Sequence, residues 1–341
     1  MGDSDMKIVI DRNIPFIATP LAEIGEVTAL PGAEITPDVM SDTDILITRT
    51  RTRCDASLLD GSKCRFIGTA TIGTDHIDLP YCAERGITVA NAPGCNAPAV
   101  AQWVLAAIEQ WLKPGEEFSD VTLGVIGAGN VGSILIRWAK SLGIKVLVND
   151  PPLQEREPEA HTYSSLAEIA RECNVITVHT PLTRKGDHPT YHLIDSAPVE
   201  QMERKPLVLN AARGPVTDTR ALIAGLEEGR ISAVGIDCWE GEPAIDSRLL
   251  DLALVATPHI AGYSRQGKIR ASQMVLDALG RYLGTDTPLQ ADAPAIGAVP
   301  ETITPAMISY DIMADTRELK SAPERFEALR NNYHLREEPG M

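Results

Sequence analysis

Short apolar runs recur through the first ninety residues of the chain, separated by polar and helical segments. The runs that resemble strands are KIVI from Lys7, DILIT from Asp44, RFIGT from Arg65 and ITVAN from Ile87. Runs of this kind, divided by helical stretches, are typical of parallel strands that are covered on both faces of a sheet. We therefore expect residues 1–95 to form the first part of an α/β domain.

A second series of apolar runs follows, and helical patterns separate most of its members. The runs are VTLGVIG, IKVLVND, NVITVHT, PLVLNAA, SAVGID and LALVATP. Six strands joined by right-handed crossovers form a doubly wound sheet. The pattern predicts a second domain over 96–258, and the helical stretch within 259–284 can return the chain to the first domain.

The region 285–341 begins differently, because four prolines between 288 and 305 indicate a connector rather than a regular element. Beyond them, MISYDIM alternates like a strand and DTRE from Asp315 has the form of a capping box. Phe326, Leu329 and Tyr333 then recur at helical spacing. We expect a small α+β domain here.

Composition limits the partners of the chain. With a formal net charge of -16, it is not expected to bind nucleic acid or anionic lipid over a broad surface. The six cysteines are scattered without a Cys-x-x-Cys pair or a spacing that suits a metal, which indicates reduced structural thiols and no metal site. No apolar run is long enough to cross a membrane. We expect a soluble cytoplasmic protein with a small-molecule partner.

A glycine motif predicts a nucleotide site. GVIGAGNVG places Gly127, Gly129 and Gly132 where a strand gives way to a helix, with Asn130 and Val131 between the last two. The glycines allow a tight turn, close approach to a pyrophosphate and close packing of helix on strand, and the helix N-terminus supplies amide donors. Alone, the motif fits a purely structural turn equally well.

Asp150 strengthens the nucleotide interpretation. It ends the next strand, KVLVND, where a carboxylate can accept hydrogen bonds from both hydroxyls of an adenosine ribose and would repel a 2′-phosphate. This favours NAD over NADP as the cofactor. The alternative is a turn residue that ends the strand before Pro151.

Three polar residues follow predicted strands of the second series: Arg213 in LNAARGPVTD, Glu242 in GIDCWEGEP and His259 in VATPHIAGY. Ligands of doubly wound sheets bind at these carboxyl ends. Oxidation of a hydroxy acid needs a proton acceptor and a cation for the carboxylate, so His259 would move the proton, Glu242 would orient its ring and Arg213 would bind the carboxylate. Taken singly, His259 could cap the following helix, Glu242 could be a solvated turn residue and Arg213 could be a surface residue.

The same three blocks resemble those of the D-isomer-specific 2-hydroxyacid dehydrogenases, with the glycine motif in its proper place between the two parts of the substrate domain. GTATIGTDHID, APGCNA, HTPLTRKGDHPTYHLID and the tail from Tyr310 resemble more narrowly the branch of that family that oxidises 4-phospho-D-erythronate in pyridoxal phosphate synthesis. The resemblance implies a Rossmann-type NAD domain inserted in a flavodoxin-like substrate domain. It also implies a homodimer, with 285–341 as the dimerisation domain.

The resemblance assigns further roles by motif match. Thr50, Thr71 and Tyr263 would touch the substrate. The NAD contacts would comprise Asp150, Thr180, Ala211, Asp237 and Gly262 besides the residues of the glycine motif. In the family the cofactor can remain tightly bound and be reoxidised by a 2-oxo acid, which we keep as a hypothesis.

Arg49, Arg51 and Arg53 occupy alternate positions just after a predicted strand. If that strand continued through them, all three would lie on one side of it and could bind a substrate phosphate. Arg49 fits the resemblance better than the other two, for which a solvated turn is the alternative.

Two other functions remain open at this point. The substrate could be 3-phosphoglycerate or another D-2-hydroxy acid. The chain could also be a non-catalytic protein that senses NAD.

Overall fold

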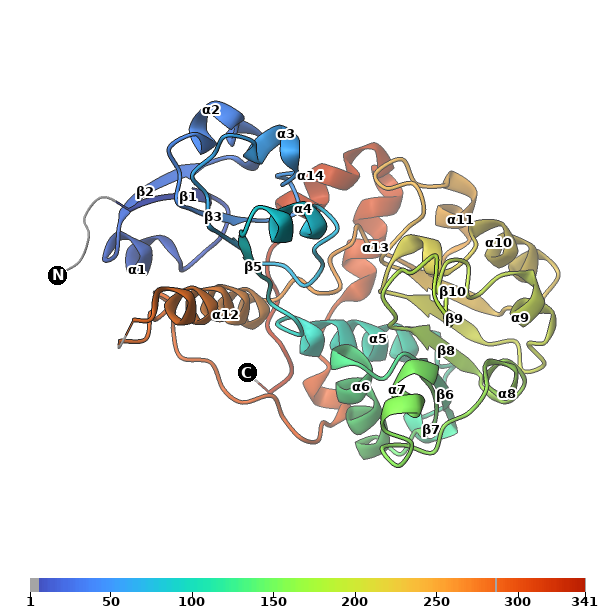
Figure 1. The fold of residues 1–341 in the computed structure, drawn as a ribbon. Helices are drawn as coiled ribbons and strands as arrows, with labels where there is room; N and C mark the ends of the chain where they lie inside the picture. The colour runs from blue at the N-terminus through green and yellow to red at the C-terminus, as the bar shows by residue number, and fades with distance from the viewer. Residues whose placement is uncertain (1–5, 286, 341) are drawn as a thin grey trace. The chain divides into compact units, whose positions relative to one another are not determined.

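The computed structural model describes residues 6–285 and 287–340 (Figure 1). The chain divides into two compact units: Met1–Asn96 with Ser264–Gly297, and Ala97–Tyr263 with Ala298–Met341. The predicted division at 95, 258 and 284 stays a prediction. In its contacts, the segment after Gly297 groups with the second unit.

The first unit is built on a parallel sheet with the order β2-β1-β3-β4-β5. Its strands are β1 Lys7–Asp11, β2 Glu26–Leu30, β3 Ile45–Thr48, β4 Phe66–Thr69 and β5 Thr88–Ala90. The order 2-1-3-4-5 is that of flavodoxin-like sheets, as predicted. Strand β2 was not predicted, because it is an edge strand with no buried residue and therefore carries no continuous apolar run.

Helices pack around this sheet. They are α1 Ala18–Ala22, α2 Pro37–Met40, α3 Ala56–Leu59, α4 Leu79–Glu84 and α12 Arg265–Leu283. Helix α12 returns the chain to the first unit, and the Ser264 hydroxyl caps its first turn by accepting a hydrogen bond from the Gly267 amide at 3.0 Å. It packs closely on β4, because a Cβ at Gly68 would lie 2.6 Å from the Val275 side chain.

The second unit contains a parallel sheet with the order β11-β10-β9-β8-β6-β7. Its strands are β6 Thr122–Ile126, β7 Lys145–Asn149, β8 Val175–Val178, β9 Leu207–Asn210, β10 Ala233–Ile236 and β11 Val255–Ala256. Tyr163 adds a single parallel bridge to Val148 of β7, so the third strand of a Rossmann sheet is reduced here to one residue. The strand order reverses between β6 and β8, which is where such sheets bind ligands.

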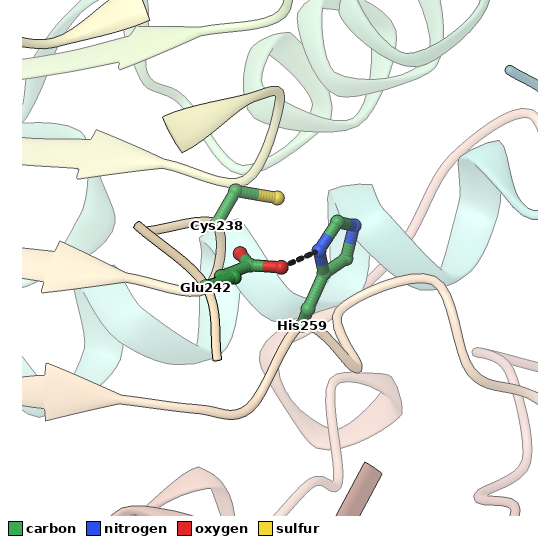
Figure 2. Close-up of side chains that lie close together, drawn as sticks. All are labelled: Cys238, Glu242 and His259. Atoms are coloured by element: carbon green, nitrogen blue, oxygen red, sulfur yellow. Dashed lines mark hydrogen bonds and ion pairs between the residues drawn. The ribbon is translucent and has the colours of Figure 1, made fainter. Parts of the chain in front are cut away.

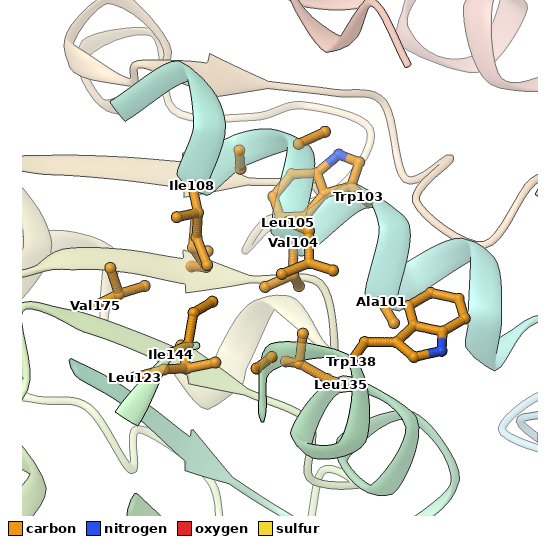
Figure 3. Packing of buried hydrophobic residues seen from close by; sticks show 14 of the residues in the cluster. Ala101, Trp103, Val104, Leu105, Ile108, Leu123, Leu135, Trp138, Ile144 and Val175 are labelled. Carbon is orange, nitrogen blue, oxygen red and sulfur yellow. The ribbon is translucent and has the colours of Figure 1, made fainter. Parts of the chain in front are cut away.

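The second unit has these helices before its last strand: α5 Ala97–Trp111, α6 Asn130–Ser141, α7 Pro151–Arg156, α8 Leu166–Glu172, α9 Ser196–Glu200, α10 Thr219–Glu227 and α11 Ser247–Leu252. Figure 3 shows α5 packed through Trp103, Val104 and Ile108 against side chains of the sheet and of α6, including Leu123 and Leu135. This core holds the glycine motif and the strand ends in fixed positions.

The tail of the second unit comprises α13 Ile312–Ser321 and α14 Phe326–Asn331. The strand expected in MISYDIM is not formed. Ile308 and Ile312 are both fully buried, but residues 308–311 are irregular and α13 begins only at Ile312. The expected cap at Asp315 is also wrong, since Asp311 caps α13 and Asp315 lies inside it. No strand is formed within 298–340, so the α+β description of the tail is corrected to helical.

None of the helices formed by residues 6–285 and 287–340 has both the length and the apolar character needed to span a membrane.

Candidate active site

The glycine motif lies at the reversal point of the second sheet. Gly127 has φ +94°, and a Cβ there would approach the His179 carbonyl to 2.8 Å. A Cβ on Gly132 would lie 2.0 Å from the Gly127 carbonyl oxygen, so that position also requires glycine. A Cβ at Gly129, in contrast, would meet nothing within 4 Å, and its backbone is open to a ligand.

A cavity of about 950 Å³ opens beside this motif, and its lining includes Gly127, Gly129, Asp150, His179 and Thr180. Both carboxylate oxygens of Asp150 accept backbone hydrogen bonds, from Ala128 N at 2.8 Å and Leu153 N at 2.9 Å. Asp150 therefore does cap α7 at a turn. Each oxygen retains a second lone pair, so the predicted ribose contact stays a prediction.

Within the described part of the chain, the Thr180 hydroxyl and His179 Nδ1 are buried in this lining without a hydrogen-bond partner. Burial without a compensating hydrogen bond costs free energy, so such atoms are typical of sites that a ligand completes. With the open backbone at Gly129, these residues fit NAD. Its pyrophosphate would lie at the N-terminus of α6, next to Asn130 and Val131, and its ribose would lie near Asp150.

His259 and Glu242 form a hydrogen-bonded pair, with Nδ1 and Oε2 separated by 2.8 Å (Figure 2). Glu242 Oε1 accepts a second hydrogen bond from Trp239 N at 2.7 Å. Burial alone would raise the pKa of Glu242, but the bonds from His259 and Trp239 and the charges of His259 and Arg330 outweigh it and lower the pKa. Glu242 is therefore an ionised acceptor that fixes the orientation of the imidazole.

The backbone of His259 is held in the left-handed region, with φ +57°. Its amide donates to the Asp237 carbonyl at 2.9 Å, and the Asp237 carboxylate accepts from the next two amides, those of Ile260 and Ala261. The same Asp237 oxygen accepts from Thr257 Oγ1, which in turn accepts from the Trp103 indole at 3.0 Å. This chain of hydrogen bonds ties the loop after His259 to helix α5. Asp237 is only 1% exposed, and its predicted contact with NAD stays a prediction.

Arg213 follows β9 in a loop that its neighbours determine. The amide of buried Asn210 donates to the carbonyls of Arg213 and Gly214 at 3.0 and 3.3 Å. A Cβ at Gly214 would lie 2.0 Å from the Trp239 carbonyl oxygen, so glycine lets this loop lie against the one that carries Glu242. Arg213 also interacts electrostatically with Cys238.

Cys238 lies with Glu242 and His259 in one cluster, as Figure 2 shows. Burial, followed by the charges of Asp237 and Glu242, raises the pKa of its thiol well above the ordinary value. The thiol is therefore neutral, and its hydrogen bond to the Ala212 carbonyl at 3.4 Å suits a structural role.

Two arginines of the tail contact this centre. Arg330 Nη1 lies 4.0 Å from Glu242 Oε2. Arg336 donates to the carbonyls of Ala99, Ile260, Ala261 and Tyr263, and its Nε donates to the Gln102 side chain. Its guanidinium also lies 4.3 Å from the centre of the Tyr310 ring. The loop that follows His259 is thus held on one side by Asp237 and on the other by Arg336.

The remaining predicted residues of the second unit lie in loops around this centre. Ala211 lies between β9 and Arg213, and Gly262 and Tyr263 follow His259; all three are half-buried. The Tyr263 ring meets the Tyr333 ring edge-on, with the centroids 6.2 Å apart.

The predicted substrate residues of the first unit differ from expectation. Strand β3 ends at Thr48, so Arg49, Arg51 and Arg53 lie in a turn and not on one side of a strand. Arg49 Nε pairs with the fully buried Asp11 at 3.1 Å. Arg53 pairs with Asp55 and is 81% exposed, as the alternative of a solvated turn proposed.

The two threonines of the first unit also lie in loops. Thr50 is exposed in the turn after β3, and Thr71 is half-buried after β4. The Thr71 hydroxyl donates to the Gly73 carbonyl at 2.9 Å and lies 2.7 Å from the Thr69 hydroxyl. Their substrate contacts stay predictions.

Similarity to known proteins agrees with this geometry. Residues 97–261 match the family described as "D-isomer specific 2-hydroxyacid dehydrogenase, NAD binding domain". An erythronate-4-phosphate dehydrogenase of Bacteroides fragilis is 44% identical over 342 residues, covering 98% of this chain and 98% of its own. Another from Marinobacter nauticus is 48% identical over 282 residues, covering 82% of this chain and 73% of its own.

The chain belongs to the D-isomer-specific 2-hydroxyacid dehydrogenase family. It is an NAD-dependent oxidoreductase that acts on a CH–OH group. The D-lactate dehydrogenase of Aquifex aeolicus, solved with NAD and lactic acid, matches it with a TM-score of 0.69 at 25% identity, covering 82% of this chain and 96% of its own. The NAD-bound 3-phosphoglycerate dehydrogenase of Entamoeba histolytica has the same fold, with a TM-score of 0.69 at 24% identity, covering 85% and 99%.

Several residues of this dehydrogenase site were missed from the sequence. Asn210 and Trp103 lie within apolar runs, where nothing marks them as polar anchors. Arg330 follows Leu329 and lies four residues after Phe326, at the edge of the apolar face of α14. This position was the one feature of the sequence that could have indicated a partly buried arginine. Arg336 lies beyond any regular element and gave none.

Proposed function

We propose that this dehydrogenase oxidises 4-phospho-D-erythronate at C2 to the 2-oxo acid (R)-3-hydroxy-2-oxo-4-phosphooxybutanoate, a step in pyridoxal 5′-phosphate synthesis. The proposal rests on relatives of that name that cover nearly the whole chain. The observation that carries the chemistry is the 2.8 Å hydrogen bond between Glu242 and His259, beside Arg213.

His259 is the proton acceptor in this proposal. Its Nδ1 side is engaged by Glu242, which leaves Nε2 to take the proton from the C2 hydroxyl group. The ionised Glu242 stabilises the imidazolium that forms. Because Asp237 and Arg336 fix the loop on both sides, the ring needs little rearrangement when the proton moves.

Arg213 binds the C1 carboxylate of the substrate. A guanidinium can hold a carboxylate through two parallel hydrogen bonds, which fixes the orientation of the adjacent C2 atom. The same positive charge polarises the carbonyl group of the product as the C–O bond gains double-bond character. The glycine motif and the N-terminus of α6 would hold NAD, which would supply the acceptor for the hydrogen and electron pair that leave C2.

The test is a rate comparison on purified protein, with 4-phosphoerythronate or 3-phosphoglycerate as substrate and a 2-oxo acid as acceptor. The acceptor is included because the reduced cofactor can remain bound. We expect turnover of 4-phosphoerythronate and little of 3-phosphoglycerate. The reverse preference would refute the proposed substrate, and loss of activity in His259→Asn with nucleotide binding retained separates an enzyme from a protein that only senses NAD.

We also propose that the chain acts as a cytoplasmic homodimer, on the basis of the resemblance of its tail. Light scattering of the purified protein tests this, and a monomer mass at micromolar concentration would refute the dimer.

A further inference from the structure

A short helix of the tail holds a cation against the proposed catalytic pair. Phe326 and Leu329 of α14 are 1% and 9% exposed and belong to the apolar cluster that also contains Trp239. This packing anchors α14 next to the loop of Glu242. Arg330 follows directly, and its side chain is only 17% exposed.

The Arg330 guanidinium is not fully used by its neighbours. Glu242, 4.0 Å away, already accepts hydrogen bonds from His259 and from Trp239 N. The buried Nε of Arg330 has no partner among the described residues. Although burial opposes it, the electrostatic interaction and hydrogen bond with the Tyr263 phenol and the charge of Glu242 raise the pKa of Arg330, so the group is always a cation.

Arg213 and Arg330 share a neighbour. Both guanidinium groups act on the Cys238 thiol, which forms a cluster with Glu242 and His259. The catalytic pair is therefore accompanied by two cations within the second unit. A buried cation with an unused donor is costly unless an anion completes it.

We infer that Arg330 binds the phosphate group of the substrate and so selects phosphorylated 2-hydroxy acids over unphosphorylated ones. The proposed substrate has two anionic ends, and Arg213 accounts for the carboxylate. Arg49, the earlier candidate for the phosphate, is already matched by Asp11 within the first unit. The identity of the acid in this inference rests on the proposed function. The preference for a phosphorylated acid does not depend on that identity.

Dissociation constants for 4-phosphoerythronate and D-erythronate, measured by calorimetry, test this in the wild type and in Arg330→Gln and Arg330→Lys. We expect Arg330→Gln to weaken binding of the phosphorylated acid by roughly 10- to 100-fold, and to change that of D-erythronate less than about twofold. Arg330→Lys should retain part of the selectivity because it keeps the charge. The exposed Arg325, five residues earlier in the same tail, provides the control Arg325→Gln, which should match the wild type.

Equal weakening of both acids in Arg330→Gln would overturn the inference, since it would mean that Arg330 only positions Glu242. If the wild type neither binds nor oxidises 4-phosphoerythronate, while 3-phosphoglycerate binds in a way that depends on Arg330, the proposed substrate fails and the inference stands. Thermal melting identifies a variant that does not fold. In that case Arg330→Lys, which preserves length and charge, decides: wild-type affinity for D-erythronate with weakened binding of the phosphorylated acid supports the inference, and parallel loss refutes it.

Discussion

The arginines at 49–53 and those of the tail differ in how visible they are in the sequence and in what they do in the structure. The first group stands out by its alternation, yet Arg53 is solvated and Arg49 is matched by Asp11. Arg330 and Arg336 of the tail do not alternate in this way, yet Arg330 lies against Glu242 and Arg336 binds the loop after His259. The alternating spacing thus did not identify a face of a strand, because the three residues lie in a turn. Contacts with residues far away in the sequence determine which cations serve the site.

The largest expected effect is that of Arg336→Met. The substitution removes the five N–H donors of the guanidinium and leaves carbonyls of the loop after His259 without these partners. It also removes a positive charge that lowers the pKa of the half-buried Asp315. We expect the free energy of unfolding to fall by about 3 kcal/mol or more, and kcat to fall roughly 10- to 100-fold as His259 loses its position. Urea unfolding and steady-state kinetics measure the two quantities.

The matched control for Arg336 is Arg317→Ala on the exposed side of α13, where the side chain is 68% exposed. It should change neither quantity noticeably. If Arg336→Met behaved like this control, the hydrogen bonds from Arg336 to the loop after His259 would contribute neither to stability nor to activity.

Arg49→Ala is expected to destabilise the first unit by about 2 kcal/mol, because it leaves the buried carboxylate of Asp11 without its cation. The double variant Asp11→Asn with Arg49→Ala should recover much of this loss. Urea unfolding measures both. A stable single variant with a raised KM only for phosphorylated acids would instead return the phosphate role to Arg49.

His179 differs from these arginines because its imidazole is held in the folded protein in its uncharged form. Burial lowers its pKa to about 3. Below pH 6.5 the unfolded chain takes up a proton that the folded imidazole refuses, so stability is complete above that pH and declines as the pH falls toward 3. At about 1.4 kcal/mol per unit, the loss attributable to His179 is on the order of 1–2 kcal/mol at pH 5. Unfolding at pH 7 and pH 5 should show this loss in the wild type and a smaller one in His179→Asn, and equal losses would contradict it.

The smallest effect is expected for Arg53→Ala. The side chain is 81% exposed, and its pair with Asp55 is screened by water. The free energy of unfolding should change by less than about 0.5 kcal/mol, and kcat/KM should change by less than about twofold. A marked loss of activity would show that the alternating arginines have a function that their exposure conceals.

Much of the fold and the proximity of Glu242 and His259 could be predicted because they depend on local rules. Apolar runs mark buried parallel strands, and residues that directly follow neighbouring strands must come together at one edge of the sheet. Glu242 and His259 follow β10 and β11, which are adjacent. The glycines of the motif are required by backbone approaches within a single strand-to-helix turn.

The parts that could not be predicted depend on contacts across long stretches of sequence. After β3 ends at Thr48, Arg49 pairs with Asp11, 38 residues earlier, and the Thr52 hydroxyl donates to the Gly32 carbonyl. The alternation of the arginines contains no information on either partner. Similarly, nothing within the tail indicates that Arg336 meets backbone carbonyls near His259.

The link between Arg336 and Ala261 also has a consequence for synthesis of the protein. The two residues are 75 positions apart, so the ribosome makes the loop after His259 well before the arginine that fixes it. At 5–20 residues per second, the interval is roughly 4 to 15 s. During that time a nascent chain contains His259 but lacks one of the two groups that hold its loop. The loop after His259 therefore acquires its full set of hydrogen bonds only after Arg336 has been made.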